Sequence, residues 1–417
     1  MAKYKVLAWG DAPTANTGFA TVSKNVLGAI HSTGQFEINQ LGINYHGDFV
    51  DKGEVPWQLV PAKLLDPKDP HGIKMFHRAL QKEEYDIVWV LNDLFVTTEA
   101  GLFIDECRAK LKAQGRKPPV FIHYYPVDCQ VSKHSTAFLE RTDLRVAYTD
   151  HGEEETYKTL PQLKGKLRKI PHGVDTKHFY PLPQERIGQL KKDLLGISPN
   201  TYLVINVNRN STRKQIPYTM LAFKEFKKKV PNAILYLHMM EKDQGGDLSR
   251  IAEDAGLVFG KDIIWPKNFN LATGFTLDQM NKIYNCADMF LSTHLGEGWG
   301  LTITEAMACG TPVVVPNNTC MPQQLGANSE RGYMWECKDQ AYIDTSGFRV
   351  KGLIPDIVDQ MMACHSDGSK FTNPKVALAL EFAKEHDWKI IGKQWVNLFA
   401  LAVQAKHNTP VQLTEVV

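Results

Sequence analysis

The 417-residue sequence lacks the patterns of a disulfide-rich, zinc-stapled or membrane-spanning protein. Its seven cysteines are an odd number and include no Cys-x-x-Cys pair, which argues against a disulfide framework and a structural zinc site. No apolar run approaches the length of a transmembrane helix. The first apolar run, Val6–Trp9, is too short for the core of a signal peptide. These absences predict a cytoplasmic protein whose cysteines are reduced.

A strong charge of either sign is also missing. Lysine and arginine total 48 against 46 acidic residues, so the formal net charge is +2. This balance gives no global attraction to nucleic acid or to an anionic membrane, although it permits a local basic patch. The hydrophobic fraction of 43% is that of a folded globular protein. A chain of this length is expected to form two domains of roughly 150–200 residues each.

Short apolar runs alternate with helical patterns in both halves of the chain. Runs such as IVWVL and VFIHYY are apolar almost throughout, as expected of strands buried on both faces. The alternation predicts an α/β protein of two doubly wound, Rossmann-like domains. We place the first domain at residues 1–181 and the second at 201–387. Prolines at 181, 183 and 199 favour a linker at 182–200, and a flexible tail is expected at 407–417.

The segment STHLGEGWGLTITEAMACGTPVVVP carries the clearest chemical signal. A strand is expected to end in its glycine-rich turn, and a helix to begin at Leu301. Gly296, Gly298 and Gly300 would let backbone amides approach a ligand, and the helix N-terminus would attract an anion. Glu305, one turn into the helix, could accept hydrogen bonds from the two hydroxyls of a ribose. The pattern indicates a binding site for a phosphorylated nucleoside.

This segment resembles the Glu-x7-Glu signature of retaining GT-B glycosyltransferases, E-G-[FW]-G-L-x-x-x-E-A-M-A-x-G-x-P-V. The resemblance, to the family 4-like, group 1 enzymes, implies a GT-B fold of two Rossmann-like domains facing each other across a cleft. It implies that Glu305 binds the ribose of the donor and that Glu297 contacts the transferred sugar as a catalytic residue. The backbone around the turn would bind the rest of the donor through Gly298, Trp299, Gly300, Leu301 and Thr302.

A second match, NVNRNSTRKQ, follows the predicted strand Tyr202–Val207. Arginine and lysine at the end of a strand are well placed to neutralise a diphosphate. The resemblance assigns this role to Arg209 and Lys214, and the adjacent Arg213 could substitute for either. In the transition state these cations would stabilise the departing nucleoside diphosphate. No Asp-x-Asp occurs in the chain, which agrees with a metal-independent enzyme that needs no cofactor beyond its nucleotide-sugar co-substrate.

Several features of the first domain also resemble the family. The loop GDAPTANTGFATVSKNV corresponds to a glycine-bearing loop that contacts the donor phosphate and the acceptor, with Gly18 as the candidate and Thr17 and Phe19 beside it. His123, in PVFIHYYPVD, is a candidate catalytic contact to the donor sugar, and Asp128 is assigned to the acceptor region. KIPHGVDTKHFYP resembles the end of the first domain, so its His172 and Asp175 are interpreted as structural. The resemblance further implies that a helix at about 388–406 returns to complete this domain.

The resulting hypothesis is a retaining hexosyl- or pentosyltransferase that moves a sugar from a nucleotide diphosphate to a hydroxyl group. UDP is the favoured nucleotide, with GDP and ADP as alternatives. The acceptor is open among saccharides, small molecules and a hydroxylated or hydroxymethylated DNA base, because the basic clusters Lys110–Lys117 and Lys158–Lys169 could grip a phosphate backbone. A phosphorylase, a nucleotide-sugar epimerase or a non-catalytic nucleotide-sugar binding protein are the alternatives from other classes.

Overall fold

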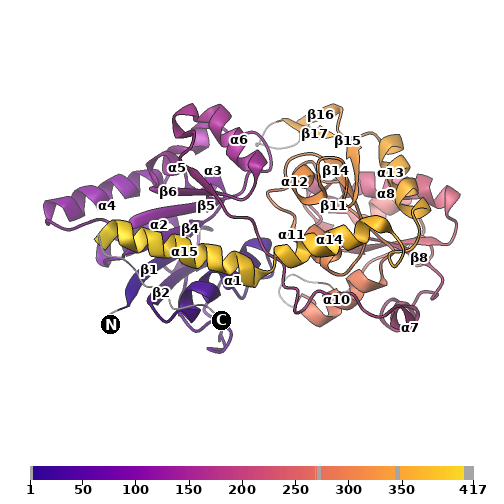
Figure 1. Ribbon diagram of the computed structural model, residues 1–417, viewed down its shortest axis with the longest axis horizontal. Helices are drawn as coiled ribbons and strands as arrows, with labels where there is room; N and C mark the ends of the chain where they lie inside the picture. Colours follow the sequence, from indigo (N-terminus) through magenta and orange to yellow (C-terminus); the bar gives the residue numbers. More distant parts are fainter. Residues whose placement is uncertain (1–2, 268, 270–273, 343–347, 408–417) are drawn as a thin grey trace. The chain divides into compact units, whose positions relative to one another are not determined.

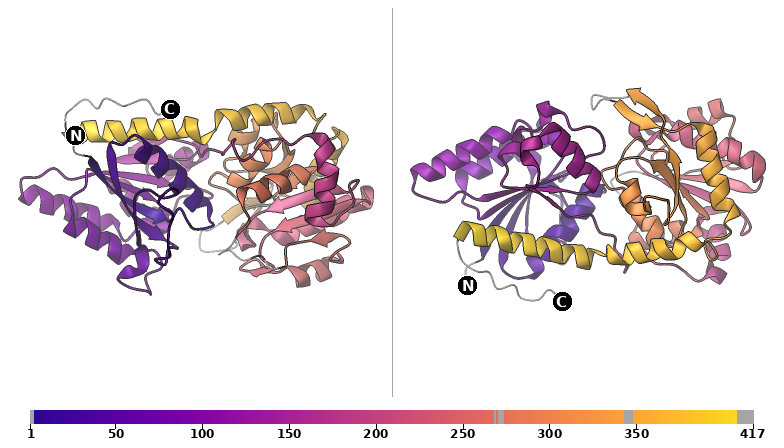
Figure 2. Two further views of the ribbon diagram at one scale, coloured as in Figure 1. Left: turned by 90° about the horizontal axis from the view of Figure 1, so that it is seen from below. Right: turned by 45° about the horizontal axis from the view of Figure 1, so that its top comes forward.

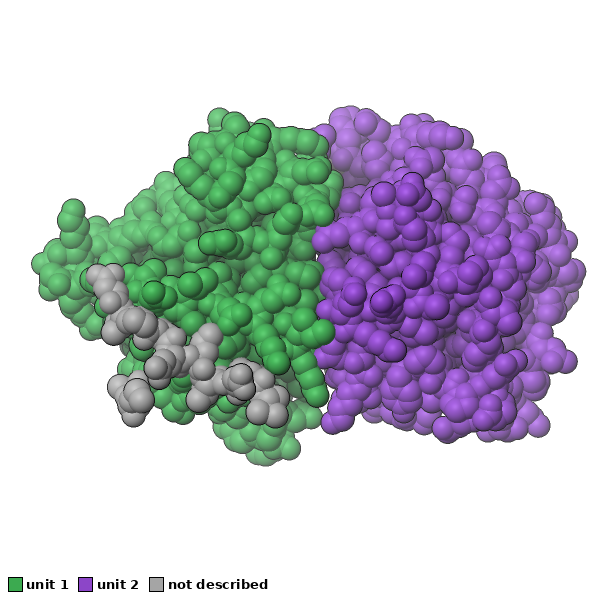
Figure 3. All heavy atoms as spheres, viewed as in Figure 1, with its two compact units in different colours: residues 1–127, 131–172, 388–417 green, residues 128–130, 173–387 purple. Residues whose placement is uncertain are grey.

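The computed structural model describes residues 3–267, 269, 274–342 and 348–407. The chain divides into two compact units, which Figure 3 colours separately. The first comprises residues 1–127, 131–172 and 388–417, and the second comprises residues 128–130 and 173–387. Each unit is built on a parallel sheet with helices against its faces (Figure 1). The predicted α/β class with two doubly wound sheets is therefore confirmed.

The sheet of the first unit has the strand order β3-β2-β1-β4-β5-β6-β7, and the order reverses at β1 as in Rossmann-like folds. All five residues of the central strand β4 are buried, because helices cover both faces of the sheet. The strands are β1 (Tyr4–Asp11), β2 (Phe36–Ile43), β3 (Gln58–Pro61), β4 (Ile87–Leu91), β5 (Val120–Tyr125), β6 (Leu144–Ala147) and β7 (Leu167–Lys169). The helices are α1 (Gly18–Ser32), α2 (Ile73–Lys82), α3 (Leu94–Thr97), α4 (Gly101–Ala113), α5 (Ala137–Arg141), α6 (Asp150–Thr159) and α15 (Trp388–His407).

Helix α15 brings the end of the described chain back to the first unit, where Figures 1 and 2 show it lying along this unit's sheet. It packs closely on α1, because Gly392 has no side chain: a Cβ there would lie 2.9 Å from the Cβ of Ala29. Trp395 is fully buried, with its ring centroid 6.0 Å from that of Trp89 and 4.6 Å from that of Tyr124. These contacts make α15 part of the core of the first unit.

The sheet of the second unit has the order β12-β9-β8-β13-β14-β15, with two separate two-stranded hairpins, β10-β11 and β16-β17. Its strands are β8 (Tyr202–Val207), β9 (Ala233–His238), β10 (Lys242–Asp243), β11 (Gly246–Asp247), β12 (Ile263–Ile264), β13 (Met289–Leu291), β14 (Val313–Asn317), β15 (Tyr333–Glu336), β16 (Asp339–Tyr342) and β17 (Phe348–Lys351). Its helices are α7 (Gln184–Leu195), α8 (Ile216–Lys229), α9 (Leu248–Ala255), α10 (Leu277–Cys286), α11 (Leu301–Ala308), α12 (Met321–Leu325), α13 (Ile354–Ser366) and α14 (Pro374–Glu385).

The boundary between the units differs from the sequence-based one. The segment expected to be a linker, 182–200, forms α7 inside the second unit, and the division falls between His172 and Gly173. The prolines at 181, 183 and 199 flank this helix without interrupting it, so their spacing delimits a helix. The expected tail, 407–417, lies outside the described residues except for His407. Among the described residues, no helix is both long and apolar enough to cross a membrane.

Candidate active site

The glycine-rich turn lies between β13 and α11 in the second unit. Gly300 precedes the first residue of α11 with φ = +85°, a left-handed conformation that favours glycine. A Cβ at Gly300 would also lie 2.9 Å from Cδ1 of Ile303. No side chain caps α11. The first amides of this helix are therefore directed at the turn, where an anion would be stabilised.

The carboxylate of Glu297 lies at the centre of a buried charge cluster in this turn. It forms an ion pair with the ammonium group of Lys214, and its Oε2 lies 3.2 Å from Nη1 of Arg213. Burial opposes ionisation of Glu297, but the two cations hold its pKa well below its usual range. Burial also lowers the pKa of Lys214, and Glu297 opposes that change. Glu297 is thus a fixed anion beside cations that can also face a ligand.

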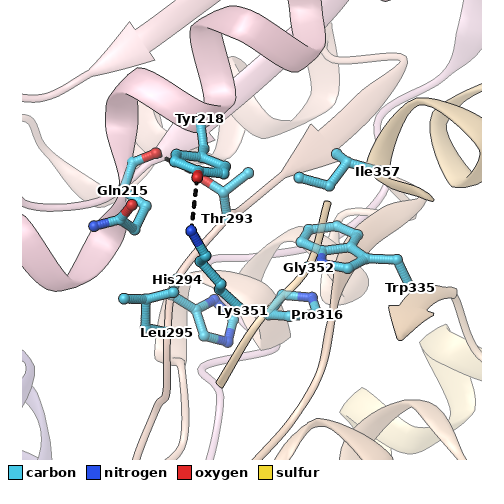
Figure 4. A pocket seen from close by; sticks show the side chains of 10 residues that line it. All are labelled: Gln215, Tyr218, Thr293, His294, Leu295, Pro316, Trp335, Lys351, Gly352 and Ile357. Carbon is cyan, nitrogen blue, oxygen red and sulfur yellow. Dashed lines mark hydrogen bonds between the residues drawn. The ribbon is translucent and has the colours of Figure 1, made fainter. Parts of the chain in front are cut away.

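The loop that carries Arg213 and Lys214 is tied to the glycine turn by hydrogen bonds. The amide of Leu295 donates to the carbonyl of Arg213 at 2.9 Å, and Nη1 of Arg213 donates to the carbonyl of Gly296. The Thr293 hydroxyl lies 2.9 Å from the carbonyl oxygen of Gln215, as Figure 4 shows. Two segments about 80 residues apart in sequence therefore form one rigid wall.

Asp128 and Arg349 extend this cluster. Asp128 belongs to the second unit, and its Oδ2 lies 3.2 Å from Nε of Arg213. Arg349, on β17, places Nη2 3.3 Å from Oδ1 of Asp128 and donates from Nη1 to the Asp128 carbonyl at 2.7 Å. Asp128 is the residue that the sequence assigns to the acceptor region, whereas nothing in the sequence identifies Arg349. No motif marks Arg349, since it lies on the second strand of a hairpin that the apolar pattern does not reveal.

Glu305 has a different environment, on the first turns of α11. Its Oε2 accepts a hydrogen bond of 2.7 Å from the hydroxyl of Tyr284 on α10. Burial raises the pKa of Glu305 to about 7, against the lowering effect of the Tyr284 hydrogen bond. The side chain is half-buried and so remains accessible. Near neutral pH, ligand hydroxyls that donate to this carboxyl would favour its ionised form.

The structure does not bring Arg209 to the Glu297 cluster. Its guanidinium binds both carboxylate oxygens of Asp243 on β10, at 2.7 and 3.2 Å, and its side chain is 53% exposed. The sequence gives no sign that Asp243 is its partner, because the β10-β11 hairpin is too short to recognise from an apolar pattern. Of the three predicted cations, Lys214 and Arg213 form the cluster and Arg209 lies outside it.

The remaining residues of the turn differ in how far they are buried. Trp299 is 2% exposed and packs on Phe382 of α14 and on His386, which follows this helix, so its side chain supports the turn from the interior. The backbone contact of Trp299 to the donor stays a prediction. The residues at the helix start that remain half-buried and face outward in part are Gly298, Gly300, Leu301 and Thr302.

His123 does not lie at a surface. Strand β5 continues to Tyr125, which leaves His123 two residues inside the strand and 0% exposed. Its ring lies 5.0 Å from that of Phe138 in an edge-on contact, and burial lowers its pKa to about 3. The side chain therefore points into the core of the first unit, and its catalytic contact to the donor sugar stays a prediction. His172 is buried as well, with its pKa lowered to about 3 by burial.

The glycine-bearing loop of the first unit follows β1. Thr17 caps α1 by accepting from the amide of Ala20 at 3.0 Å, and its hydroxyl donates to the carboxylate of Asp11. Burial raises the pKa of Asp11, and this hydrogen bond opposes the rise. Gly18 and Thr17 are exposed, and Phe19 is half-buried. The loop is therefore open to a ligand at the carboxyl edge of the first sheet.

Comparison with known proteins finds a family match that includes the residues of this candidate site. Residues 189–345 match the family described as glycosyl transferases, group 1. Over 217 residues the chain is 25% identical to the alpha-galactosylglucosyldiacylglycerol synthase of Streptococcus pneumoniae, covering 49% of this chain and 54% of that one. Over 335 residues it is 28% identical to the UDP-Gal:alpha-D-GlcNAc-diphosphoundecaprenol alpha-1,3-galactosyltransferase of Escherichia coli, covering 73% and 77%. The chain spans 62% of the alpha-maltose-1-phosphate synthase of Mycobacterium tuberculosis, so several curated relatives are matched over less than two thirds of their length.

Solved structures show the fold. A sucrose-phosphate synthase from Thermosynechococcus elongatus superimposes with a TM-score of 0.69 at 15% identity, over 97% of this chain and 100% of that one. A glycosyltransferase from Rickettsia africae gives a TM-score of 0.69 at 14% identity, over 97% and 100%. Residues 189–345 therefore match the group 1 glycosyl transferases, the chain is similar to named glycosyltransferases, and its two Rossmann-like units have the GT-B fold of the solved structures.

Proposed function

We propose that this protein transfers a sugar from a nucleotide diphosphate donor to a hydroxyl acceptor, with retention of anomeric configuration and without a metal ion. The observation that carries the proposal is the Glu297 cluster at the start of α11. A buried carboxylate held by Lys214 and Arg213 lies beside a glycine turn and an uncapped helix start. The cations, the turn and the helix start can bind a diphosphate that carries a sugar. Glu305 lies further along the same helix, where it can bind the ribose.

The proposed reaction breaks the bond between the sugar's anomeric carbon and the oxygen of the donor diphosphate. The acceptor hydroxyl attacks from the same face, and its proton passes to a diphosphate oxygen as the new glycosidic bond forms. Lys214, Arg213 and the start of α11 stabilise the negative charge of the departing nucleoside diphosphate. Glu297 remains ionised because its cations hold its pKa low, which suits electrostatic support of a positively charged sugar.

The names of related proteins support the choice of UDP and of retention. The relative from Escherichia coli is named for UDP-Gal, and the O-GlcNAc transferase GtfA, a structural neighbour with a TM-score of 0.54, is described in complex with UDP and GlcNAc. Several relatives are named for α-linked products, which a retaining enzyme forms from an α-linked nucleotide sugar. GDP- and ADP-sugars remain the alternative donors.

The acceptor is proposed only as a class, a saccharide or other hydroxyl-bearing small molecule. One observation favours a test of DNA carrying a hydroxylated base. Lys117 and Arg168, from two basic stretches far apart in sequence, line one groove of the first unit together with Arg108 and Lys406. Binding to duplex DNA that falls steeply with salt, and that weakens in a Lys117→Glu, Arg168→Glu double variant, would support this acceptor. Activity on a small acceptor with no retention of DNA would exclude it.

The test of the proposal is a donor screen. The protein is incubated with UDP-, GDP- and ADP-sugars and candidate acceptors, and mass spectrometry follows the release of nucleoside diphosphate and the mass of the acceptor. A transferase increases the acceptor's mass by one sugar residue and releases one nucleoside diphosphate for each transfer. An epimerase changes the sugar and releases nothing, and a binding protein leaves all components unchanged. Activity that disappears with EDTA and returns with a divalent ion would contradict the metal-independent mechanism.

A further inference from the structure

The β16-β17 hairpin is anchored to the wall of the candidate site. Nζ of Lys351 lies 3.0 Å from the hydroxyl of Tyr218 on α8 and 5.3 Å from the centre of its ring, a contact drawn in Figure 4. At the end of β17 the backbone of Gly352 approaches Trp335 so closely that a Cβ would lie 2.2 Å from its ring. Strand alternation then places Arg349 on the same face of the strand as Lys351.

This placement puts Arg349 against the glycine turn. The side chain is 5% exposed, and Nη1 lies 3.1 Å from the position that a Cβ on Gly296 would take. A buried guanidinium is costly unless anionic or carbonyl oxygens surround it. In this structure Asp128 supplies both, through its carbonyl and its carboxylate. Arg349 is therefore an anion-binding group at the edge of the proposed donor site.

Three cations, Arg213, Lys214 and Arg349, surround the carboxylates of Asp128 and Glu297. The Asp128 carboxylate is shared by two guanidinium groups, at 3.2 Å from Arg213 and 3.3 Å from Arg349. Two forked donors around one anion are the arrangement that suits a phosphate group. The side chain of Asp128 is 27% exposed, so it can turn to solvent when another anion enters.

We propose that Arg349 binds the diphosphate of the donor together with Arg213, and that Asp128 occupies the phosphate position in the donor-free protein. This inference rests on the proposed function, since it names a further residue of the same site. The incoming diphosphate displaces Asp128 because it carries more charge and more acceptor oxygens than one carboxylate. Asp128 thereby lowers the affinity for the nucleotide, whereas Arg349 raises it.

Isothermal titration of the full chain with UDP and with uridine separates the two roles. Arg349→Gln should weaken UDP binding about tenfold or more, because a charge-assisted contact to phosphate is lost, while Arg349→Lys should recover part of it. Asp128→Asn should tighten UDP binding several-fold, because the internal competitor loses its charge while keeping its shape. Uridine carries no phosphate, so its affinity should stay unchanged in all three variants. Arg250→Gln, an exposed substitution on α9, serves as the control.

The outcomes distinguish this inference from the proposed function. If the wild type binds UDP and Arg349→Gln binds it equally well, or if Asp128→Asn binds UDP more weakly, the inference is wrong and the proposed function stands. If the wild type binds none of UDP, GDP and ADP, both fail. A loss of uridine binding alongside UDP binding would show that Arg349 only supports the fold. If Arg349→Gln fails to fold, the affinity of Asp128→Asn for UDP still tests the inference, because that affinity should rise.

Discussion

Two glutamates eight residues apart have opposite electrostatic states at the candidate site. Glu297 faces Lys214 and Arg213, which hold its pKa well below its usual range, whereas Glu305 faces a phenol and burial raises its pKa to about 7. The motif predicted both residues and their relation to a donor. It could not predict their ionisation, because the partners come from α10 and from the loop before α8, segments whose proximity only folding creates.

The first prediction concerns the pH dependence of Glu305. Its pKa in the folded protein is raised above the ordinary value of 4.5, so its contribution to stability is complete below that value and is lost as the pH rises through about 7. Uridine should bind more tightly as the pH rises from about 6 to about 8, since the ionised carboxylate accepts hydrogen bonds from both ribose hydroxyls. In Glu305→Gln the affinity for uridine should be lower and independent of pH over this range. A wild-type affinity that falls with rising pH would contradict the assignment.

The second prediction concerns Lys214. Its replacement by methionine removes a cation from the leaving group and leaves Glu297 with Arg213 alone, so the rate of sugar transfer should fall by about a hundredfold or more. Steady-state kinetics with a competent donor measures the loss. The exposed Lys228→Met, on α8, is the matched control and should retain wild-type kinetics. A Lys214→Met rate within twofold of wild type would remove this residue from the mechanism.

At the scale of elements, the sequence predicts those helices and strands that a local pattern of apolar residues and glycines marks. The buried strands β4, β5 and β8 and the helix that begins at Leu301 follow from apolar runs and glycine stops. The hairpins β10-β11 and β16-β17 escape prediction because strands of two to four residues carry no readable period. His123 lies in β5, where the apolar run VFIHYY predicts a strand, but an apolar run buried on both faces does not show which side chains reach the strand's exposed edge. Arg349 and Asp243 reach their partners only through these hairpins.

The third prediction tests the turn before α11. Gly300→Ala should lower the thermal midpoint, with a cost of about 1–2 kcal/mol, because alanine is strained in the left-handed region and its Cβ would crowd Ile303. The control is Gly28→Ala inside α1, where a Cβ meets no atom within 4 Å and where alanine should be neutral or stabilising. Calorimetry of both variants measures the difference. Equal midpoints would show that the turn does not require glycine.

At the scale of the whole molecule, each unit has its own parallel sheet, and the last described helix belongs to the first unit. The two-domain α/β organisation is predictable from the repeated strand–helix pattern. The division at residue 172 is not, because α7 occupies the proline-flanked segment that resembles a linker. The return of α15 depends on long-range packing of its apolar face, which the apolar pattern alone does not show and which only the resemblance to the family implies.

The fourth prediction tests that packing. Trp395→Ala should destabilise the protein by about 3–5 kcal/mol, because a fully buried indole between Trp89 and Tyr124 leaves a cavity when removed. Leu401→Ala on the same helix removes a side chain that is 54% exposed and should change stability little. Thermal unfolding of both variants measures this. Equal effects would mean that α15 does not form part of the core.

The most direct test of the central claim, that the turn and helix from Glu297 to Glu305 hold a nucleotide-sugar donor, is a binding titration of UDP. Wild type, Glu305→Ala and Lys214→Ala are compared, with circular dichroism confirming that the three proteins are folded. The wild type should bind UDP, and each substitution should weaken binding at least about tenfold, Glu305→Ala through lost ribose contacts and Lys214→Ala through lost diphosphate contacts. Unchanged affinity in both folded variants would contradict the claim.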